Sequence, residues 1–298
     1  MSLEIKGLIA AVFSPFDKDG YVDLAPIPKL VEHLIDSGIN GLYAMGSTGE
    51  GLSMTVRQRM EVTDAYIGAV SGRIPVIVNV SHTSYDATEE LTKHAVGAGA
   101  DAVSATLPAY YTVSSIDQLV LAVRKIAECQ NDVPFIYYHI PGKTGLNFKM
   151  HTFLERIGDT LPQLGGIKYT SGAIDDFMMC QQIYGDRYKM FFGVDELFLP
   201  ALAMGADSFV GSTYNFMAPT YHNITEKYAK GDQQGAKAEY FRAVRIIDAL
   251  LGYDGLASQK AIMKMSGHDF GPPRSPLQPL AQNEYDTFYQ NLKNIGLF

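Results

Sequence analysis

The sequence predicts an α/β fold, a (β/α)8 barrel with a C-terminal helical appendage. Eight short apolar runs recur in the first part of the chain, and a helical pattern or a helix-sized segment follows each run. The chain has 298 residues, 47% of them hydrophobic, which is enough to bury the core of one large α/β domain. Eight such units over roughly 225 residues have the size of a (β/α)8 barrel. A doubly wound sheet is the alternative, but no GxGxxG motif follows the first run.

The predicted elements follow one another in regular order. Ser84 and Ser115 each precede an aspartate by two residues, a pattern typical of helix N-termini. A glycine in Ala-Gly-Ala-Asp (98–101), and again in Met-Gly-Ala-Asp (204–207), predicts a helix stop before the next strand. The strands are predicted to begin near Gly7, Gly41, Pro75, Ala102, Phe135, Leu164, Met190 and Ala206, with helices including 24–37, 55–70, 84–96, 115–129 and 175–184.

The last part of the chain has a different pattern. We expect residues 1–230 to form the barrel and residues 231–298 to form a helical extension of the same domain. Helical spacing covers 236–251, a second segment lies around 258–265, and a last helix is predicted over 283–295 after several prolines.

Composition limits the possible partners. A net charge of -8 argues against a nucleic-acid or anionic-membrane partner. No stretch approaches the roughly 18 apolar residues of a membrane span, and the N-terminal residues lack a signal-peptide core, so we expect a cytoplasmic chain. The two cysteines form no CxxC motif, and the seven histidines form no HxH or HExxH motif. We therefore expect no metal site.

Lys168 ends an otherwise apolar run, Leu-Gly-Gly-Ile-Lys (164–168), which reads as a buried parallel strand. In a barrel, the active site lies at the C-terminal ends of the strands. Desolvation would lower the pKa of such a lysine and expose the free amine that condenses with a carbonyl. The alternative is a strand-end lysine whose ammonium extends to water.

Other polar residues follow strands at the same predicted rim. The loop Gly-Ser-Thr-Gly-Glu (46–50) offers hydroxyls and N–H groups that can hold a carboxylate, although it is equally read as an ordinary loop. Tyr137 and Tyr138 must face opposite sides of their strand, so only one can point into the barrel, where it could move a proton or merely pack. Asp195 and Glu196 follow a strand-end glycine, and we expect one to bind substrate and the other to start a helix.

Four motifs together resemble the N-acetylneuraminate lyase and dihydrodipicolinate synthase family of class I aldolases. They occur in the family's order and the resemblance covers essentially the whole chain. The motifs are Gly-Ser-Thr-Gly-Glu (46–50), Tyr-His-Ile-Pro (138–141) with Thr144-Gly145, Gly-Ile-Lys (166–168) with Thr-Ser-Gly (170–172), and Gly-Ser-Thr-Tyr-Asn (211–215).

This resemblance implies a Schiff-base lyase with no cofactor or metal. It makes Lys168 the residue that forms the Schiff base with pyruvate and Tyr138 the proton-transfer residue. Ser47 and Thr48 would hold the pyruvyl carboxylate, and Ser47 would also orient the phenol. Tyr110 would reach the site of a neighbouring subunit, which implies a homo-oligomer, a tetramer by resemblance. The remaining substrate-binding residues implied are Thr170, Gly193, Asp195, Glu196 and Ser212.

Within the family the resemblance favours the sialic acid lyase branch, which cleaves N-acetylneuraminate to N-acetylmannosamine and pyruvate. Two positions depart from the pattern. Lys143 stands where dihydrodipicolinate synthases place an arginine and sialic acid lyases usually place an uncharged residue, and Ala109 stands where an aromatic residue is common. Two alternatives therefore stay open. One is another pyruvate-dependent aldolase, like 4-hydroxy-tetrahydrodipicolinate synthase, with Lys143 binding an acidic aldehyde; the other is a non-catalytic sensor that binds keto acids.

Overall fold

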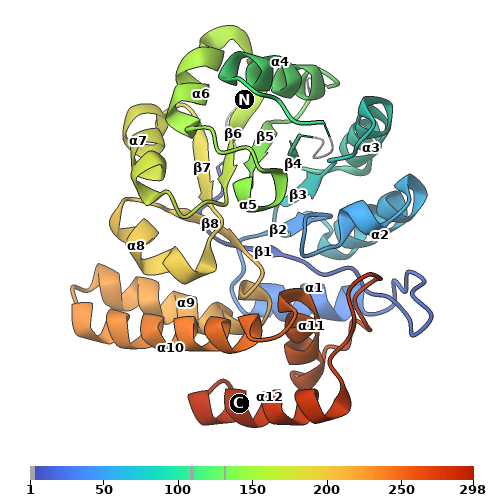
Figure 1. Cartoon of the computed structure of the whole chain (residues 1–298), viewed down its shortest axis with the longest axis vertical. Helices are drawn as coiled ribbons and strands as arrows, with labels where there is room; N and C mark the ends of the chain where they lie inside the picture. Colours follow the sequence, from blue (N-terminus) through green and yellow to red (C-terminus); the bar gives the residue numbers. More distant parts are fainter. Residues whose placement is uncertain (1–3, 108–110, 131) are drawn as a thin grey trace.

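Eight parallel strands form a closed barrel in the computed structural model, which describes residues 4–107, 111–130 and 132–298 (Figure 1). Each strand pairs with the next in sequence, and the last pairs with the first, so the predicted (β/α)8 barrel is confirmed. The strands are β1 (Gly7–Ala11), β2 (Gly41–Ala44), β3 (Val76–Asn79), β4 (Ala102–Ala105), β5 (Phe135–His139), β6 (Leu164–Tyr169), β7 (Lys189–Phe192) and β8 (Ser208–Gly211).

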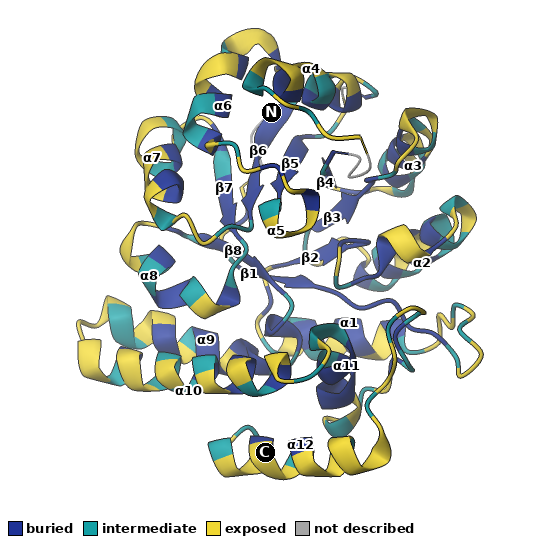
Figure 2. Ribbon diagram, viewed as in Figure 1, coloured by how far each residue is buried: buried dark blue, intermediate teal, exposed yellow. Residues whose placement is uncertain are grey.

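Helices cover the outside of the barrel, with their buried faces toward the strands and their exposed faces toward solvent (Figure 2). The side chains of Thr55, Ser84 and Ser115 cap the helices that follow them, and the latter two confirm the predicted N-termini. The helices up to residue 229 are α1 (Ile27–Asp36), α2 (Val56–Val70), α3 (Tyr85–Ala98), α4 (Ile116–Ala127), α5 (Pro141–Thr144), α6 (Met150–Ile157), α7 (Ile174–Tyr184), α8 (Phe198–Ala203) and α9 (Tyr214–Ala229).

Alternation along the strands divides the core into two apolar clusters. The larger cluster lies between the strands and the helices, and the smaller one fills the inside of the barrel. Tyr137 belongs to the outer cluster, where its ring lies 5.2 Å from that of Phe153 on α6. Tyr138 belongs to the inner cluster. The prediction that only one of the two tyrosines faces the inside is confirmed.

Three further helices follow the barrel, α10 (Gln233–Leu251), α11 (Gly255–Met265) and α12 (Gln282–Ile295). Helix α10 packs against α9, α11 and α12, and Figure 1 shows α11 and α12 below the barrel. The division at residue 231 stays a prediction. Within the described ranges, no helix is both long and apolar enough to cross a membrane.

Candidate active site

The predicted site residues that the structure describes gather at the C-terminal ends of the strands. One cavity of about 200 Å³ is lined by residues of β1, β5, β6 and β8, by loop residues that follow β2, β6, β7 and β8, and by residues of α10 and α11. A second cavity of about 640 Å³ is lined mainly by residues of the loops after β2, β3, β4 and β5. Tyr138 lines both cavities, so the two adjoin at this side chain.

Lys168 is the central residue of the smaller cavity. It lies on β6, is only 4% exposed, and is paired in register with Tyr138 of β5. Its Nζ lies 3.8 Å from the ring centroid of Tyr43 and 4.2 Å from that of Tyr138. Burial lowers the pKa of Lys168 to about 7, although the charge of Asp195 opposes the shift. A large fraction of this amine is therefore unprotonated and nucleophilic near neutral pH.

Tyr138 presents its phenol to the same space. Burial raises the pKa of Tyr138, while the neighbouring hydroxyls of Ser47 and Thr170 lower it. Thr170 Oγ1 is buried and makes no hydrogen bond of ordinary geometry within the described part of the chain. A phenol flanked by two hydroxyls beside an amine can pass a proton between the cavity and its neighbours.

Sequence reasoning missed Tyr43, whose ring lies against the Lys168 amine. Tyr43 is on β2, and its hydroxyl lies 3.0 Å from Ser104 Oγ and accepts a hydrogen bond of 3.0 Å from Asn79 Nδ2. The rings of Tyr43 and Tyr138 meet edge to face at 5.8 Å. Alternation along β2 was the available signal, since it places Tyr43 inside the barrel between the outward Leu42 and Ala44.

Asp195 and Glu196 take different positions at the far wall of the cavity. Both begin a short 3-10 turn, η3 (Asp195–Leu197), and both line the cavity. Asp195 is buried, and its Oδ2 accepts hydrogen bonds from Thr213 N (3.0 Å) and Thr213 Oγ1 (2.7 Å). Burial raises the pKa of Asp195, and the Thr213 hydrogen bonds oppose that rise. Glu196 is exposed. The supporting residue Thr213 was not predicted.

Two glycines make room for these polar groups. A Cβ at Gly193 would collide with Thr170 Oγ1, and a Cβ at Gly211 would collide with the Asp195 carboxylate. Asp195 Oδ1 has no hydrogen-bond partner among the described residues, although it is buried. Ser212 follows Gly211 and lines the same wall. An unsatisfied carboxylate oxygen at a cavity wall is suited to accept a hydrogen bond from a hydroxyl-bearing ligand.

Residues of the predicted carboxylate-binding loop line both of the cavities that adjoin at Tyr138. Thr48 lines the smaller cavity, whereas Ser47 lines the larger one together with Lys143. Tyr110 and Ala109 lie outside the described residues. Within the described ranges, no group of three or more His, Cys, Asp or Glu side chains is arranged to hold a metal ion.

Comparison with known proteins identifies the family of this chain. The Dihydrodipicolinate synthetase family model matches residues 4–295. N-acetylneuraminate lyase of Mus musculus is 33% identical over 298 residues, which cover 98% of this chain and 93% of that protein. The structure of Proteus mirabilis N-acetylneuraminate lyase superposes with a TM-score of 0.96 at 35% identity, covering 99% of this chain and 100% of that one. The Aliivibrio salmonicida N-acetylneuraminate lyase (sialic acid aldolase) gives 0.95 at 33% identity, with coverage of 100% and 98%. The chain therefore belongs to the dihydrodipicolinate synthetase family.

Proposed function

We propose that this protein is a class I, Schiff-base-forming lyase that cleaves N-acetylneuraminate to N-acetylmannosamine and pyruvate. The observation that carries the proposal is the buried Lys168 amine, which lies against the Tyr138 ring and has a pKa lowered to about 7. The similarity to N-acetylneuraminate lyases over nearly the full chain supports the choice of substrate.

The first step joins the substrate to the enzyme. The Lys168 amine attacks the C2 ketone of the open-chain sugar acid, and water leaves to give an iminium. Ser47 and Thr48 hold the adjacent carboxylate through hydroxyl and backbone N–H groups. No metal or cofactor takes part, because the iminium itself withdraws electrons from the neighbouring C3–C4 bond.

The second step breaks the C3–C4 bond. Tyr138 relays the proton lost by the C4 hydroxyl, whose carbon becomes the aldehyde of N-acetylmannosamine. The bond's electron pair moves into the iminium and gives an enamine, which is protonated at C3 and hydrolysed to release pyruvate. Ser47 orients the phenol. The remaining wall holds the sugar part of the substrate through Thr170, Gly193, Asp195, Glu196 and Ser212.

The test couples pyruvate release from N-acetylneuraminate to lactate dehydrogenase and, separately, traps the enzyme with pyruvate and borohydride. Wild-type protein is expected to turn over and to form a reduced covalent adduct, because borohydride reduces the iminium. Lys168→Ala is expected to form no adduct. Equal trapping of wild type and Lys168→Ala would contradict the assignment.

The position of Lys143 favours a second candidate, a pyruvate-dependent aldolase that condenses with an acidic aldehyde. Lys143 is exposed and lines the larger cavity beside Ser47 and Tyr138. A lysine at this wall supplies a positive charge near the reacting carbon, although it lacks the planar, bidentate geometry of arginine. Two results would favour this candidate. The enzyme would be trapped with pyruvate but would not turn over N-acetylneuraminate, and it would turn over an acidic aldehyde in a reaction that Lys143→Met abolishes.

We further propose that the chain is a cytoplasmic homo-oligomer, a tetramer by resemblance, in which Tyr110 enters a neighbouring subunit's site. The similarity to the family supports this proposal. Light scattering measures the assembly, and a monomer with full activity would contradict it. We also treat residues 231–298 as an extension of the barrel domain, since Leu250 and Gln259 line the cavity beside Lys168.

A further inference from the structure

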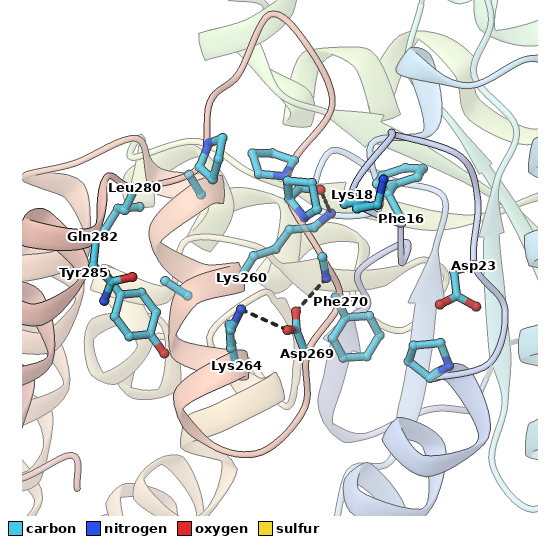
Figure 3. A pocket seen from close by; sticks show the side chains of 17 residues that line it. Phe16, Lys18, Asp23, Lys260, Lys264, Asp269, Phe270, Leu280, Gln282 and Tyr285 are labelled. Carbon is cyan, nitrogen blue, oxygen red and sulfur yellow. Dashed lines mark hydrogen bonds and ion pairs between the residues drawn. The ribbon is translucent and has the colours of Figure 1, made fainter.

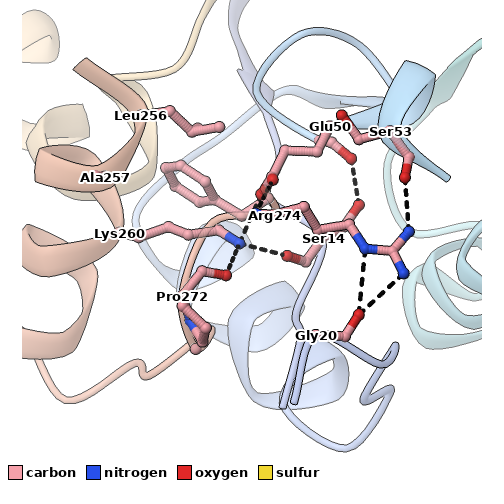
Figure 4. A network of polar contacts seen from close by, with 12 residues as sticks. Ser14, Gly20, Glu50, Ser53, Leu256, Ala257, Lys260, Pro272 and Arg274 are labelled. Atoms are coloured by element: carbon pink, nitrogen blue, oxygen red, sulfur yellow. Dashed lines mark hydrogen bonds and ion pairs between the residues drawn. The ribbon is translucent and has the colours of Figure 1, made fainter. Parts of the chain in front are cut away.

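A buried ion pair joins the predicted carboxylate-binding loop to the C-terminal helices. Lys260 Nζ on α11 lies 2.7 Å from Glu50 Oε1, and the two side chains are 2% and 3% exposed (Figure 4). Glu50 is the last residue of the Gly-Ser-Thr-Gly-Glu loop that contains Ser47 and Thr48. Helix α11 therefore contacts this loop directly through an ion pair.

Three oxygen atoms surround the Lys260 ammonium. It forms the ion pair with Glu50 and donates hydrogen bonds of 3.1 Å to Ser14 O and 3.1 Å to Pro272 O. Its Nζ lies 4.5 Å from the ring centroid of Phe16. An ammonium group has three N–H donors, and three acceptors surround this one, so its position is fixed from several directions.

The second carboxylate oxygen of Glu50 also has a partner. Its Oε2 accepts a hydrogen bond of 2.7 Å from Arg274 N. The Arg274 guanidinium donates to Ser53 O at 2.7 Å and to Gly20 O at 2.9 Å. The carboxylate is thus held between α11 and the segment that follows it.

The loop has a backbone that needs such support. Met45 and Glu50 have positive φ angles of 62° and 50°, a region that residues with a side chain seldom occupy. Glu50 N donates to Ser47 O at 3.1 Å, and Gly51 N donates to Gly46 O at 3.2 Å. These turns tie the position of Glu50 to the position of Ser47. A shift of Glu50 therefore displaces Ser47, which lines the larger cavity, and Thr48, which lines the smaller one.

We propose that the Glu50–Lys260 pair positions Ser47 and Thr48 for the substrate carboxylate, so that α11 acts on the active site through this contact. Glu50 lines the larger cavity beside Ser47, but neither Glu50 nor Lys260 lines the cavity that holds Lys168, so both are positioning residues in this scheme. The inference rests on the proposed function, since it assigns the loop to the pyruvyl carboxylate.

A neighbouring cavity allows the pair to be tested without unfolding the protein. Lys260 also lines a cavity of about 720 Å³ between α11, α12 and the Pro-rich segment, together with Lys264 and Asp269 (Figure 3). An ammonium that loses Glu50 has room to move toward water in this cavity. Glu50→Gln is therefore expected to fold with a displaced loop.

The experiment measures the half-saturating pyruvate concentration for borohydride trapping, read as the modified fraction by mass spectrometry. Glu50→Gln and Lys260→Met each leave one charge unpaired, and each is expected to raise this concentration about tenfold. The double variant lacks the same contact and is expected to stay raised about tenfold, no more than either single variant, because both residues act through one contact. The matched control is Lys264→Met, on the same helix as Lys260. It removes the exposed 3.1 Å ion pair between Lys264 and Asp269 and is expected to leave the half-saturating pyruvate concentration unchanged.

The outcomes separate positioning from simple stability. A purely structural pair would lower the melting temperature and the folded fraction but leave the half-saturating concentration of the folded enzyme unchanged, and that result would overturn the inference. Kinetics on N-acetylneuraminate should show the loss mainly in KM, with kcat less affected. If a single variant fails to fold, Glu50→Asp, which keeps the charge and shortens the side chain, takes its place under the same criterion. Absence of trapping in wild type would instead refute the proposed function.

Discussion

The two lysines buried near the loop after β2 have the same side chain and opposite surroundings. Lys168 and Lys260 are both buried, and each amine lies against an aromatic ring. Lys260 has a carboxylate at 2.7 Å and two carbonyl acceptors. Among the residues that the structure describes, none forms an ion pair with Lys168. Burial lowers the pKa of both amines, and only at Lys260 does a directly paired carboxylate oppose that shift.

This difference shows that burial alone does not make a lysine reactive. The charge of a paired ammonium is stabilised by its carboxylate partner, and in this charged form it has no lone pair to offer. An unpaired amine beside a cavity is easily deprotonated and can attack a carbonyl. Four experiments test this difference between the two lysines.

The largest difference is expected in turnover when each lysine becomes methionine. Lys168→Met should lower kcat by at least about 10⁴-fold, because the covalent step is lost. Lys260→Met should keep kcat within about tenfold of wild type, because only positioning is affected. Coupled pyruvate release measures both. Comparable losses of kcat in the two variants would remove the distinction between a reactive and a structural lysine.

Tyr138→Phe tests the proton relay beside the reactive lysine. It should lower kcat by about 10²–10⁴-fold, which is the usual contribution of general acid–base catalysis. Borohydride trapping with pyruvate should persist, since the Lys168 amine is still present. Loss of trapping in a folded Tyr138→Phe protein would mean that the phenol is needed to form the Schiff base itself.

The same methionine substitutions should change the free energy of unfolding in opposite directions. Lys260→Met leaves Glu50 buried without its partner and should cost about 3–5 kcal/mol. Lys168→Met removes a desolvated amine and should stabilise the protein by about 1–4 kcal/mol at pH 7.

The sign for Lys168 follows from its pKa, which burial lowers from 10.5 to about 7. Between these values the unfolded state binds more protons, so the wild-type free energy of unfolding rises with pH. The advantage of Lys168→Met should therefore shrink between pH 7 and pH 10. Urea unfolding at several pH values measures this, and a constant difference would contradict it.

The pH dependence of adduct formation should give the smallest effect. At subsaturating pyruvate, the trapping rate should fall about tenfold per pH unit below 7, because the amine becomes protonated, and should level off above 7. The initial rate of adduct formation is measured by mass spectrometry, with the folded fraction as control. A midpoint near 10 would mean that burial does not activate Lys168.

The local pattern of the chain was sufficient for the barrel and for its reactive end. Apolar runs and helix caps predicted the strand order, and a charge at the end of an apolar run singled out Lys168, because periodicity and capping are properties of neighbouring residues. The carboxylate loop and the acidic pair after β7 were also predicted, since each begins within three residues of the end of a strand. The resemblance to a family then supplied the proposed roles.

The order of the elements, the end of the barrel at which polar residues collect and the reactive lysine all follow from local sequence patterns. The contacts of the buried charged groups depend on the folded chain: Tyr43 against Lys168, Thr213 behind Asp195, and Glu50 against Lys260. Those contacts join residues on different strands and helices. Barrel closure and the packing of α11 bring them together, and no local periodicity records which distant side chains will meet.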